Sequence, residues 1–420
     1  MTRLLDQRAF ALTMLMSSLL LLVVASGLLS SLLGIRAHLE GFAVEYIGLM
    51  GTAYFGGYVL ASLKVPSIVG TIGNIRTFAG FAALASVSSL AHLFWISPLA
   101  WFVLRASTGF CYAGMIIVVE GWLNGTAQKT NRGRLFAIYS ITFTGAWALS
   151  QQLLRVGELE GFRPFILAGM IFTLALVPIT LGRTVEPGMI VAHRITLRRL
   201  YGLTPIGMAG ALVSGFCAGA FIGLGPVFAG QLNHGAEGVS LFMSVTILGA
   251  LVMHGPVGIL SDRFDRRKVI IALSSVSAAV SLLVVIGYHM PFWLLLVLGC
   301  IFGGSTFSLY ALSAAHVNDH IEPSELVPTA GQLILVYGFG AMAGPFISGV
   351  VMGWIGPAGL FASLCAFEAV LVVFCLYRLP KRLPVPEDLK MPFLHVPRTS
   401  HAILGLLRRY DDLYRKNTRG

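Results

Sequence analysis

The stretch that decides the fold is GILSDRFDRRK, residues 258–268, which joins two long apolar stretches at 239–260 and 268–288. Each apolar stretch supplies the roughly 20 residues that a helix needs to cross the hydrocarbon core of a bilayer. The segment between them is rich in arginine and lysine, which are costly to place in that core. The sequence therefore predicts two transmembrane helices joined by a short basic turn at one membrane surface.

Similar apolar stretches recur along all 420 residues, of which 56% are hydrophobic and only 11% are charged, with a mean hydropathy of +0.82. Soluble globular proteins carry about 25% charged residues. The apolar runs are continuous and do not alternate with polar residues, which favours helices over a β-barrel. We predict an all-α integral membrane protein with twelve transmembrane helices. The predicted spans are 11–33, 44–63, 77–95, 99–121, 135–154, 164–181, 205–228, 239–260, 268–288, 291–315, 327–351 and 358–377.

The net charge of +11 is distributed unevenly between the two sides of these spans. If the N-terminus lies in the cytoplasm, the outer segments hold only Arg36, Arg155 and Arg163, and Arg105 lies within a span. All other lysines and arginines then fall on the inner side. This asymmetry follows the positive-inside rule and predicts that both termini are cytoplasmic. The net positive charge is therefore explained by the orientation of the protein in a lipid bilayer, and no nucleic-acid partner is needed to account for it.

The longest internal loop divides the predicted spans into six and six. We expect an N-terminal half at 1–181, a linker at 182–204, a C-terminal half at 205–377 and a basic cytoplasmic tail at 378–420. Apolar and basic residues alternate at helical spacing in the linker and again at 403–414, which favours short amphipathic helices at the membrane surface. A partner-binding role of the tail helix is the alternative.

The turn at 258–268 resembles the G-x-x-x-D-R-x-x-R-R signature of the major facilitator superfamily. Glycine allows two helices to approach closely, and an aspartate at a helix end can pair with an arginine or with a neighbouring helix N-terminus. We expect these residues to form a gating latch. Its members are Gly258, Asp262, Arg263, Arg266 and Arg267. The corresponding loop of the first half, from Gly57 to Lys64, lacks the aspartate.

Other segments extend the resemblance over most of the chain. Arg105 and Gly109 resemble an R-x-x-q-G pattern of the superfamily, and Glu120-Gly-Trp-Leu-Asn124 with Tyr139 resembles the bacterial YcaD-type permeases. The resemblance implies a transporter of the bacterial inner membrane. It also implies two pseudo-symmetric six-helix halves, with the substrate site between them.

Ionisable and polar residues inside the spans are candidates for a central cavity, because such residues are costly in a membrane unless they are paired or face water. The candidates are Arg105, Glu120, Gln151, His254, Tyr310 and Glu368. Arg105 could instead extend to the outer surface, His254 could be a core histidine, and Glu368 could pack against a polar neighbour. The resemblance implies a role for Arg105 in proton coupling. Gln152 is a further cavity candidate.

The functional hypothesis is a secondary active transporter that moves a small solute by alternating access, with a proton as the coupling ion. The sequence contains no Walker phosphate loop, dinucleotide fingerprint, nucleophile motif or cysteine–histidine metal cluster, so we expect no cofactor, no metal and no enzymatic activity. We expect a monomer. A non-transporting receptor or assembly factor built on a transporter fold is the alternative.

Overall fold

The computed structural model describes residues 2–126, 132–181, 196–232, 234–287, 289–322 and 325–381. These residues form α-helices joined by short turns, with no strand among them. The first helices are α1 (Thr2–Leu39), α2 (Val44–Ile72), α3 (Asn74–Phe94), α4 (Pro98–Thr126), α5 (Arg132–Gln152), α6 (Arg163–Leu174) and α7 (Leu176–Leu181), with the 3-10 turn η1 (Leu153–Arg155) after α5.

The remaining helices follow the linker. They are α8 (Leu197–Leu203), α9 (Pro205–Gln231), α10 (Gly235–Arg263), α11 (Arg266–Gly287), α12 (Phe292–Asn318), α13 (Leu326–Ile355) and α14 (Gly359–Arg378), with the 3-10 turn η3 (Leu379–Lys381) at the end. Every predicted span coincides with one of the long helices, and α6 and α7 together occupy the span predicted at 164–181. The predicted all-α membrane fold is confirmed.

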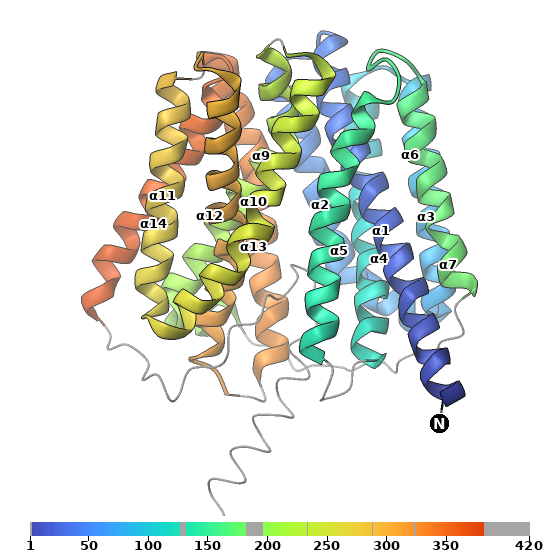
Figure 1. Cartoon of the computed structure of the whole chain (residues 1–420), viewed down its shortest axis with the longest axis horizontal. Coiled ribbons are helices and arrows are strands. Elements are labelled where there is room, and N and C mark those ends of the chain that lie inside the picture. The colour runs from blue at the N-terminus through green and yellow to red at the C-terminus, as the bar shows by residue number, and fades with distance from the viewer. Residues whose placement is uncertain are drawn as a thin grey trace, which may run out of the picture.

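Eleven spans in the described residues are long and apolar enough to cross a membrane, counting α6 and α7 as one. The predicted span that falls outside this set is α5, which Figure 1 shows crossing the same layer as its neighbours. Its sequence is less apolar because it places Tyr139, Ser140 and Thr144 on the wall of an internal pocket. The prediction of twelve spans is consistent with this arrangement.

The helices form two groups. Figure 1 shows α1 to α7 on one side of the molecule and α9 to α14 on the other. We call them the N-terminal group and the C-terminal group. The turns between helices are short: Gly73 alone separates α2 from α3, and its φ of 84° is one that residues with a side chain rarely adopt.

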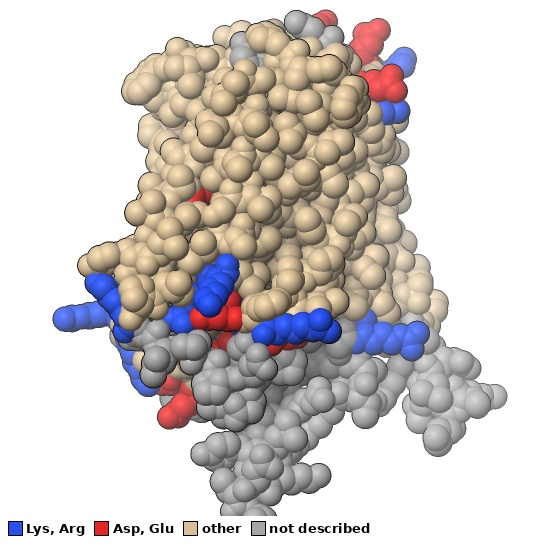
Figure 2. Space-filling view, turned by 60° about the vertical axis from the view of Figure 1, so that its left-hand side comes forward, with Lys and Arg blue, Asp and Glu red and all other residues tan. Residues whose placement is uncertain are grey.

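Most exposed charge gathers at the two ends of the molecule. Figure 2 shows a broad band that is almost free of charged side chains, bounded at its lower edge by lysine and arginine side chains. We call this end the basic face; it carries Lys64, Arg76, Arg199, Arg263 and Lys268, and the other end is the opposite face. Large apolar side chains are exposed within the band, as at Val87, Ile286 and Val373. An apolar band of this kind suits contact with lipid tails.

Close packing of small residues joins the two groups nearer the opposite face. A Cβ atom added at Gly48 of α2 would overlap the carbonyl oxygen of Pro345 in α13. The Thr52 hydroxyl, one turn further along α2, donates a 2.7 Å hydrogen bond to the Met342 carbonyl of α13. A Cβ atom added at Gly34 of α1 would lie only 3.3 Å from the Gly223 carbonyl oxygen of α9. Small residues thus allow helix backbones of the two groups to touch.

The short helix predicted in the linker is present as α8, and its first turn is capped by the Thr196 hydroxyl, which accepts a hydrogen bond from the Arg199 backbone N–H. The helix predicted at 403–414 lies outside the described residues.

Candidate functional site

A central pocket lies between the two groups of helices. Residues of α1, α2, α4 and α5 line one wall, and residues of α9, α10, α12 and α13 line the other. The pocket encloses about 1120 Å³ of space free of atoms, a volume that includes its mouth. Its position between the two groups therefore suits a solute that contacts both at once.

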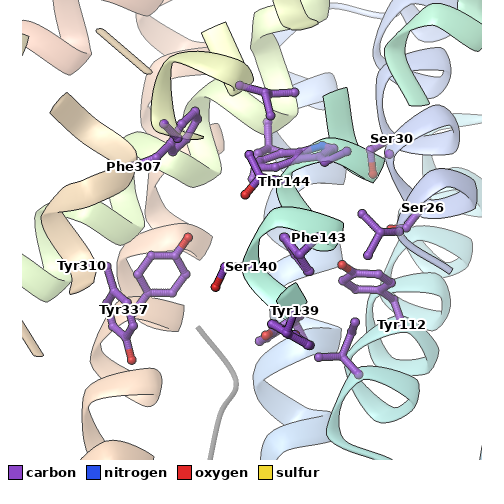
Figure 3. Close-up of a pocket in the computed structure, with 18 of the residues that line it drawn as sticks. Ser26, Ser30, Tyr112, Tyr139, Ser140, Phe143, Thr144, Phe307, Tyr310 and Tyr337 are labelled. Carbon is purple, nitrogen blue, oxygen red and sulfur yellow. The ribbon is translucent and has the colours of Figure 1, made fainter. Parts of the chain in front are cut away.

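The walls of this pocket are aromatic. Figure 3 shows Tyr310 and Tyr337 on one wall and Tyr112, Tyr139 and Phe143 across from them. The rings of Tyr310 and Tyr337 meet edge to face, with centroids 5.1 Å apart. The other aromatic lining residues are Tyr54, Phe55, Tyr58, Trp147 and Phe307. Aromatic rings offer flat apolar faces, and tyrosines add a hydroxyl at the rim of each ring.

The polar groups of the pocket are neutral hydroxyls, apart from the imidazole of His254 and the indole N–H of Trp147. Ser26, Ser30, Ser140 and Thr144 add hydroxyls to those of the tyrosines, and His254 supplies the imidazole. Among the described residues that line the pocket, none is a lysine, arginine, aspartate or glutamate. Such a surface can stack on a planar solute and exchange hydrogen bonds with it, and it offers no fixed charge to pair with an ion.

Arg105 lies directly behind this wall, in α4. Its side chain is 4% exposed, so it does not extend to the membrane surface, and that alternative is wrong. The guanidinium carbon lies 4.4 Å from the centroid of the Tyr54 ring, and Nη1 donates a 3.4 Å hydrogen bond to Ser30 Oγ. The Tyr54 and Ser26 hydroxyls lie 3.1 Å apart. Arg105 thus contacts two pocket residues without lining the pocket itself, and it polarises the face of Tyr54.

Glu120 occupies a similar position further along α4. The residue is buried, and its Oε1 atom accepts a 2.6 Å hydrogen bond from the hydroxyl of Tyr139, which lines the pocket. A short hydrogen bond to a carboxylate is a strong one. Arg105 and Glu120 therefore form a second layer, and each contacts a different tyrosine of the wall.

The two glutamines at the end of α5 have different surroundings. Gln151 is buried outside the pocket, where its Oε1 atom accepts a 2.7 Å hydrogen bond from Ser31 of α1. Gln152 points to the other group and donates a 2.7 Å hydrogen bond from Nε2 to the Ser244 hydroxyl of α10. Ser244 in turn donates to the Ala148 carbonyl at 2.9 Å. Gln152 therefore joins the two groups near the opposite face.

Glu368 lies away from the central pocket, contrary to the expectation that it would line it. It is fully buried in α14, where Thr306 donates a 3.4 Å hydrogen bond to its Oε1 atom and Cys217, Ser274 and Ser277 surround it. This cluster belongs to α9, α11, α12 and α14. The expectation is wrong because α14 packs on the outer side of its group and turns its polar side toward α11 and α12. Of the predicted cavity residues, Tyr310 and His254 line the pocket, and Arg105, Glu120, Gln151 and Glu368 do not.

The turn at 258–268 forms its ion pairs differently from the expected latch. Asp262 is 47% exposed, and its Oδ1 atom lies 3.6 Å from Arg266 Nη2. The buried pair is Arg266 with Asp319 at the end of α12, with Nε 2.8 Å from Oδ2 and side chains only 1% and 2% exposed. Gly258 is buried on α10, and Arg263 is exposed.

Arg267 extends this network to the end of α14. Its Nη2 atom lies 2.6 Å from Asp265 Oδ2, and its Nη1 atom donates a 3.3 Å hydrogen bond to the Leu379 carbonyl. Burial raises the pKa of Asp265, but hydrogen bonds from the Arg267 side chain and backbone lower it more, so the pKa lies below its usual value. The basic turn therefore ties the ends of α11, α12 and α14 together within the C-terminal group.

Comparisons with known proteins agree with this architecture. Residues 207–410 match the family model described as Major Facilitator Superfamily. An uncharacterized MFS-type transporter of Enterobacter sp. (strain 638) is 24% identical over 379 residues, which cover 89% of this chain and 97% of the relative. The uncharacterized MFS-type transporter YcaD of Salmonella arizonae is 23% identical over 367 residues, or 86% and 94% of the two chains. The C-terminal part of the chain thus matches the superfamily model, and most of the chain is similar to YcaD-type MFS transporters.

Solved structures of transporters share this superfamily fold. A crystal structure of a mutant nucleoside transporter NupG matches with a TM-score of 0.76 at 14% identity, covering 87% of this chain and 99% of that chain. A bacterial homolog of the human lysosomal transporter Spinster, in an inward-facing and occupied conformation, matches with a TM-score of 0.69 at 16% identity, covering 91% and 98%. The resemblance to the superfamily and its YcaD-type members is confirmed.

Several residues of the central pocket and of the buried ion pairs were not predicted from the sequence. Tyr54 and Tyr58 lie four residues apart on α2, and Tyr112 lies on α4. Residues four apart share one side of a helix, so the spacing on α2 could have indicated that these tyrosines face the pocket. Asp319 follows α12 directly, at a helix end where an acid is unfavourable next to the helix dipole. That unfavourable position was a signal that it needs a buried cationic partner.

Proposed function

We propose that this protein is a secondary active transporter that carries a small, neutral, partly aromatic solute by alternating access. The observation that carries the proposal is the central pocket, which both groups of helices line with aromatic rings and hydroxyls. None of its described lining residues carries a carboxylate, an ammonium or a guanidinium group. The superfamily's known members transport solutes between two halves of this kind. NupG is a nucleoside transporter, so nucleosides are the first solutes to test.

The contacts between the groups support an inward-facing state in this structure. Gly48 with Pro345, Gly34 with Gly223, and Gln152 with Ser244 join the groups toward the opposite face. We place the protein in the bacterial inner membrane as a monomer with both termini and the basic face in the cytoplasm, because the basic residues gather there. Residues 1–181 and 205–377 would then act as the two moving halves, joined by the linker 182–204.

We assign the coupling ion as a proton and Glu120 as its acceptor. Among the described residues, Glu120 and Glu368 are the carboxylates buried within spans. Glu120 contacts a pocket tyrosine, so a change in its charge reaches the solute through one hydrogen bond. Glu368 is the alternative acceptor, in a cluster that does not touch the pocket.

Uptake of radiolabelled nucleosides and related aromatic solutes into proteoliposomes, with and without a proton gradient, tests this proposal. Tyr310→Phe removes a pocket hydroxyl and should lower uptake, whereas Tyr46→Phe, at an exposed position, should not. Binding of a solute to the purified protein without movement across the membrane would instead favour the receptor or assembly-factor alternative. Failure of a broad panel to bind or move would contradict the proposal.

A further inference from the structure

A second cavity lies at the basic face, at the end of the C-terminal group. It encloses about 470 Å³ of space free of atoms, including its mouth. The junction of α8 and α9, the first turn of α11, the end of α12 and the junction of α14 and η3 meet around it. It shares no lining residue with the central pocket, so the transport proposal does not account for it.

The titratable side chains that line this cavity are all of basic type. They are Arg267, His316, His320, Arg378 and Lys381. Asp265 offsets the charge of Arg267. Lys381 Nζ lies 3.6 Å from the Tyr377 ring centroid, and the Arg378 guanidinium carbon lies 6.0 Å from that of Tyr201. In the described part of the chain, no carboxylate forms an ion pair with Arg378 or Lys381. The cavity therefore has an excess of positive charge.

His316 points to a ligand independently of this charge. The residue is only 6% exposed and lines the cavity, and no hydrogen bond joins its ring nitrogens to any described residue. The imidazole is therefore available to a donor or acceptor that enters the cavity from outside the described chain.

The start of α9 adds backbone donors on the same side. Thr204, Pro205 and Ile206 line the cavity, and α9 runs for 27 residues from Pro205. The first backbone N–H groups of a helix have no partner within it, and the helix dipole places partial positive charge at this end. Helix N-termini commonly bind phosphate groups for this reason. Basic side chains, an unpartnered imidazole and a helix N-terminus thus meet in one cavity.

We propose that this cavity binds a phosphate group, either in the headgroup of an anionic phospholipid or as free phosphate. Phosphate oxygens accept hydrogen bonds from guanidinium, ammonium, imidazole and backbone donors, which are the donors present here. The position favours the lipid source, because the cavity lies at the basic face and Leu376 and Tyr377 beside it are exposed on α14. Basic pockets between spans bind anionic headgroups in other membrane proteins.

Native mass spectrometry of the full chain in detergent, titrated with phosphatidylglycerol, tests the proposal. The double variant Arg378→Gln with Lys381→Gln should bind this lipid about tenfold more weakly, as expected when charge-assisted contacts are lost. The matched control is Arg263→Gln with Lys268→Gln, which removes the same charge from exposed positions on the same face that do not line the cavity. The control should bind as the unmodified chain does.

Further measurements distinguish an anionic lipid from free phosphate as the ligand and separate loss of binding from misfolding of a variant. Phosphatidylcholine, whose headgroup has no net charge, should bind equally to all three proteins. If millimolar inorganic phosphate raises the melting temperature of the unmodified chain and the control but not of the double variant, the free ion also occupies the site. His316→Gln, which keeps a hydrogen-bonding side chain, should weaken lipid binding less than the double variant. Equal lipid and phosphate binding by the double variant and the control would overturn the proposal.

Discussion

The hydroxyl of Tyr139 donates a 2.6 Å hydrogen bond to the buried carboxylate of Glu120, and the same tyrosine forms part of the pocket wall. This contact joins a residue that can carry a proton to a surface that can hold a solute. Arg105 contacts the wall in a comparable way through Tyr54 and Ser30. The charged residues of α4 therefore act on the pocket through tyrosines and serines.

Replacing Glu120 by glutamine should uncouple transport from the proton gradient. The amide keeps a hydrogen-bond acceptor for Tyr139 but cannot bind and release a proton. Gradient-driven uptake into proteoliposomes should be lost, while exchange of labelled for unlabelled solute at equal pH should persist. The matched control is Glu368→Gln, the other buried carboxylate. Retention of gradient-driven uptake by Glu120→Gln, with its loss in Glu368→Gln, would assign coupling to Glu368 instead.

Arg105→Lys should reduce transport although it keeps the positive charge. Lysine lacks the planar guanidinium that lies over the Tyr54 ring at 4.4 Å, and the two side chains are not interchangeable at stacked sites. A loss of about 1 kcal/mol, or roughly fivefold in solute affinity, is expected from such a contact. Equilibrium binding to purified protein measures it. Arg155→Lys, at a half-exposed site, serves as the control, and an equal loss there would count against this role.

Gly48→Ala should weaken contact between the two groups at the opposite face. The added Cβ would overlap the Pro345 carbonyl of α13, so α2 and α13 must separate. Overpacking of this kind costs about 1–3 kcal/mol. Distances between spin labels placed on the two groups should shift toward longer values at the opposite face. Gly80→Ala on α3, where the added atom meets open space, should leave the distances unchanged.

Asp319→Asn should destabilise the protein more than Asp262→Asn does. Asp319 pairs with Arg266 at 2.8 Å with both side chains almost completely buried, and breaking a buried pair typically costs about 3–5 kcal/mol. Asp262 is half-exposed, and such pairs contribute about 0–1 kcal/mol. Thermal unfolding of the two variants in the same detergent compares them. Equal melting temperatures would show that the buried pair is not the main connection of this turn.

Stability should fall in acid partly through Asp265. Its pKa in the folded protein is lowered, so its ionised form contributes stability above the unfolded value of about 3.9, and this contribution is lost as the pH falls through the lower folded pKa. Asp265→Asn removes this titration, so its melting temperature should depend less on pH below about 4. An unchanged pH dependence in that variant would contradict the assignment.

The order and type of the helices could be predicted from the sequence because each transmembrane helix satisfies its own backbone hydrogen bonds. Its length and apolar content then suffice to identify it. The span at α5 shows the limit of this rule, since its pocket-facing residues lower its hydropathy below that of its neighbours. The basic turns and the short linker helix could also be located from the sequence, because each depends on residues that are neighbours along the chain.

Only the tertiary structure decided which polar residues share the pocket. In a span such as α12, most residues that face lipid and most residues that face other helices are apolar, so the sequence does not show which side of the helix faces the pocket. That is why Tyr310 faces the pocket while Glu368 lies in a separate cluster. The same reason applies to Arg266, whose partner Asp319 is 53 residues away and becomes its neighbour only when α11 packs beside α12. The sequence by itself determined the spans and the charged turns, and the packing of the helices determined the site.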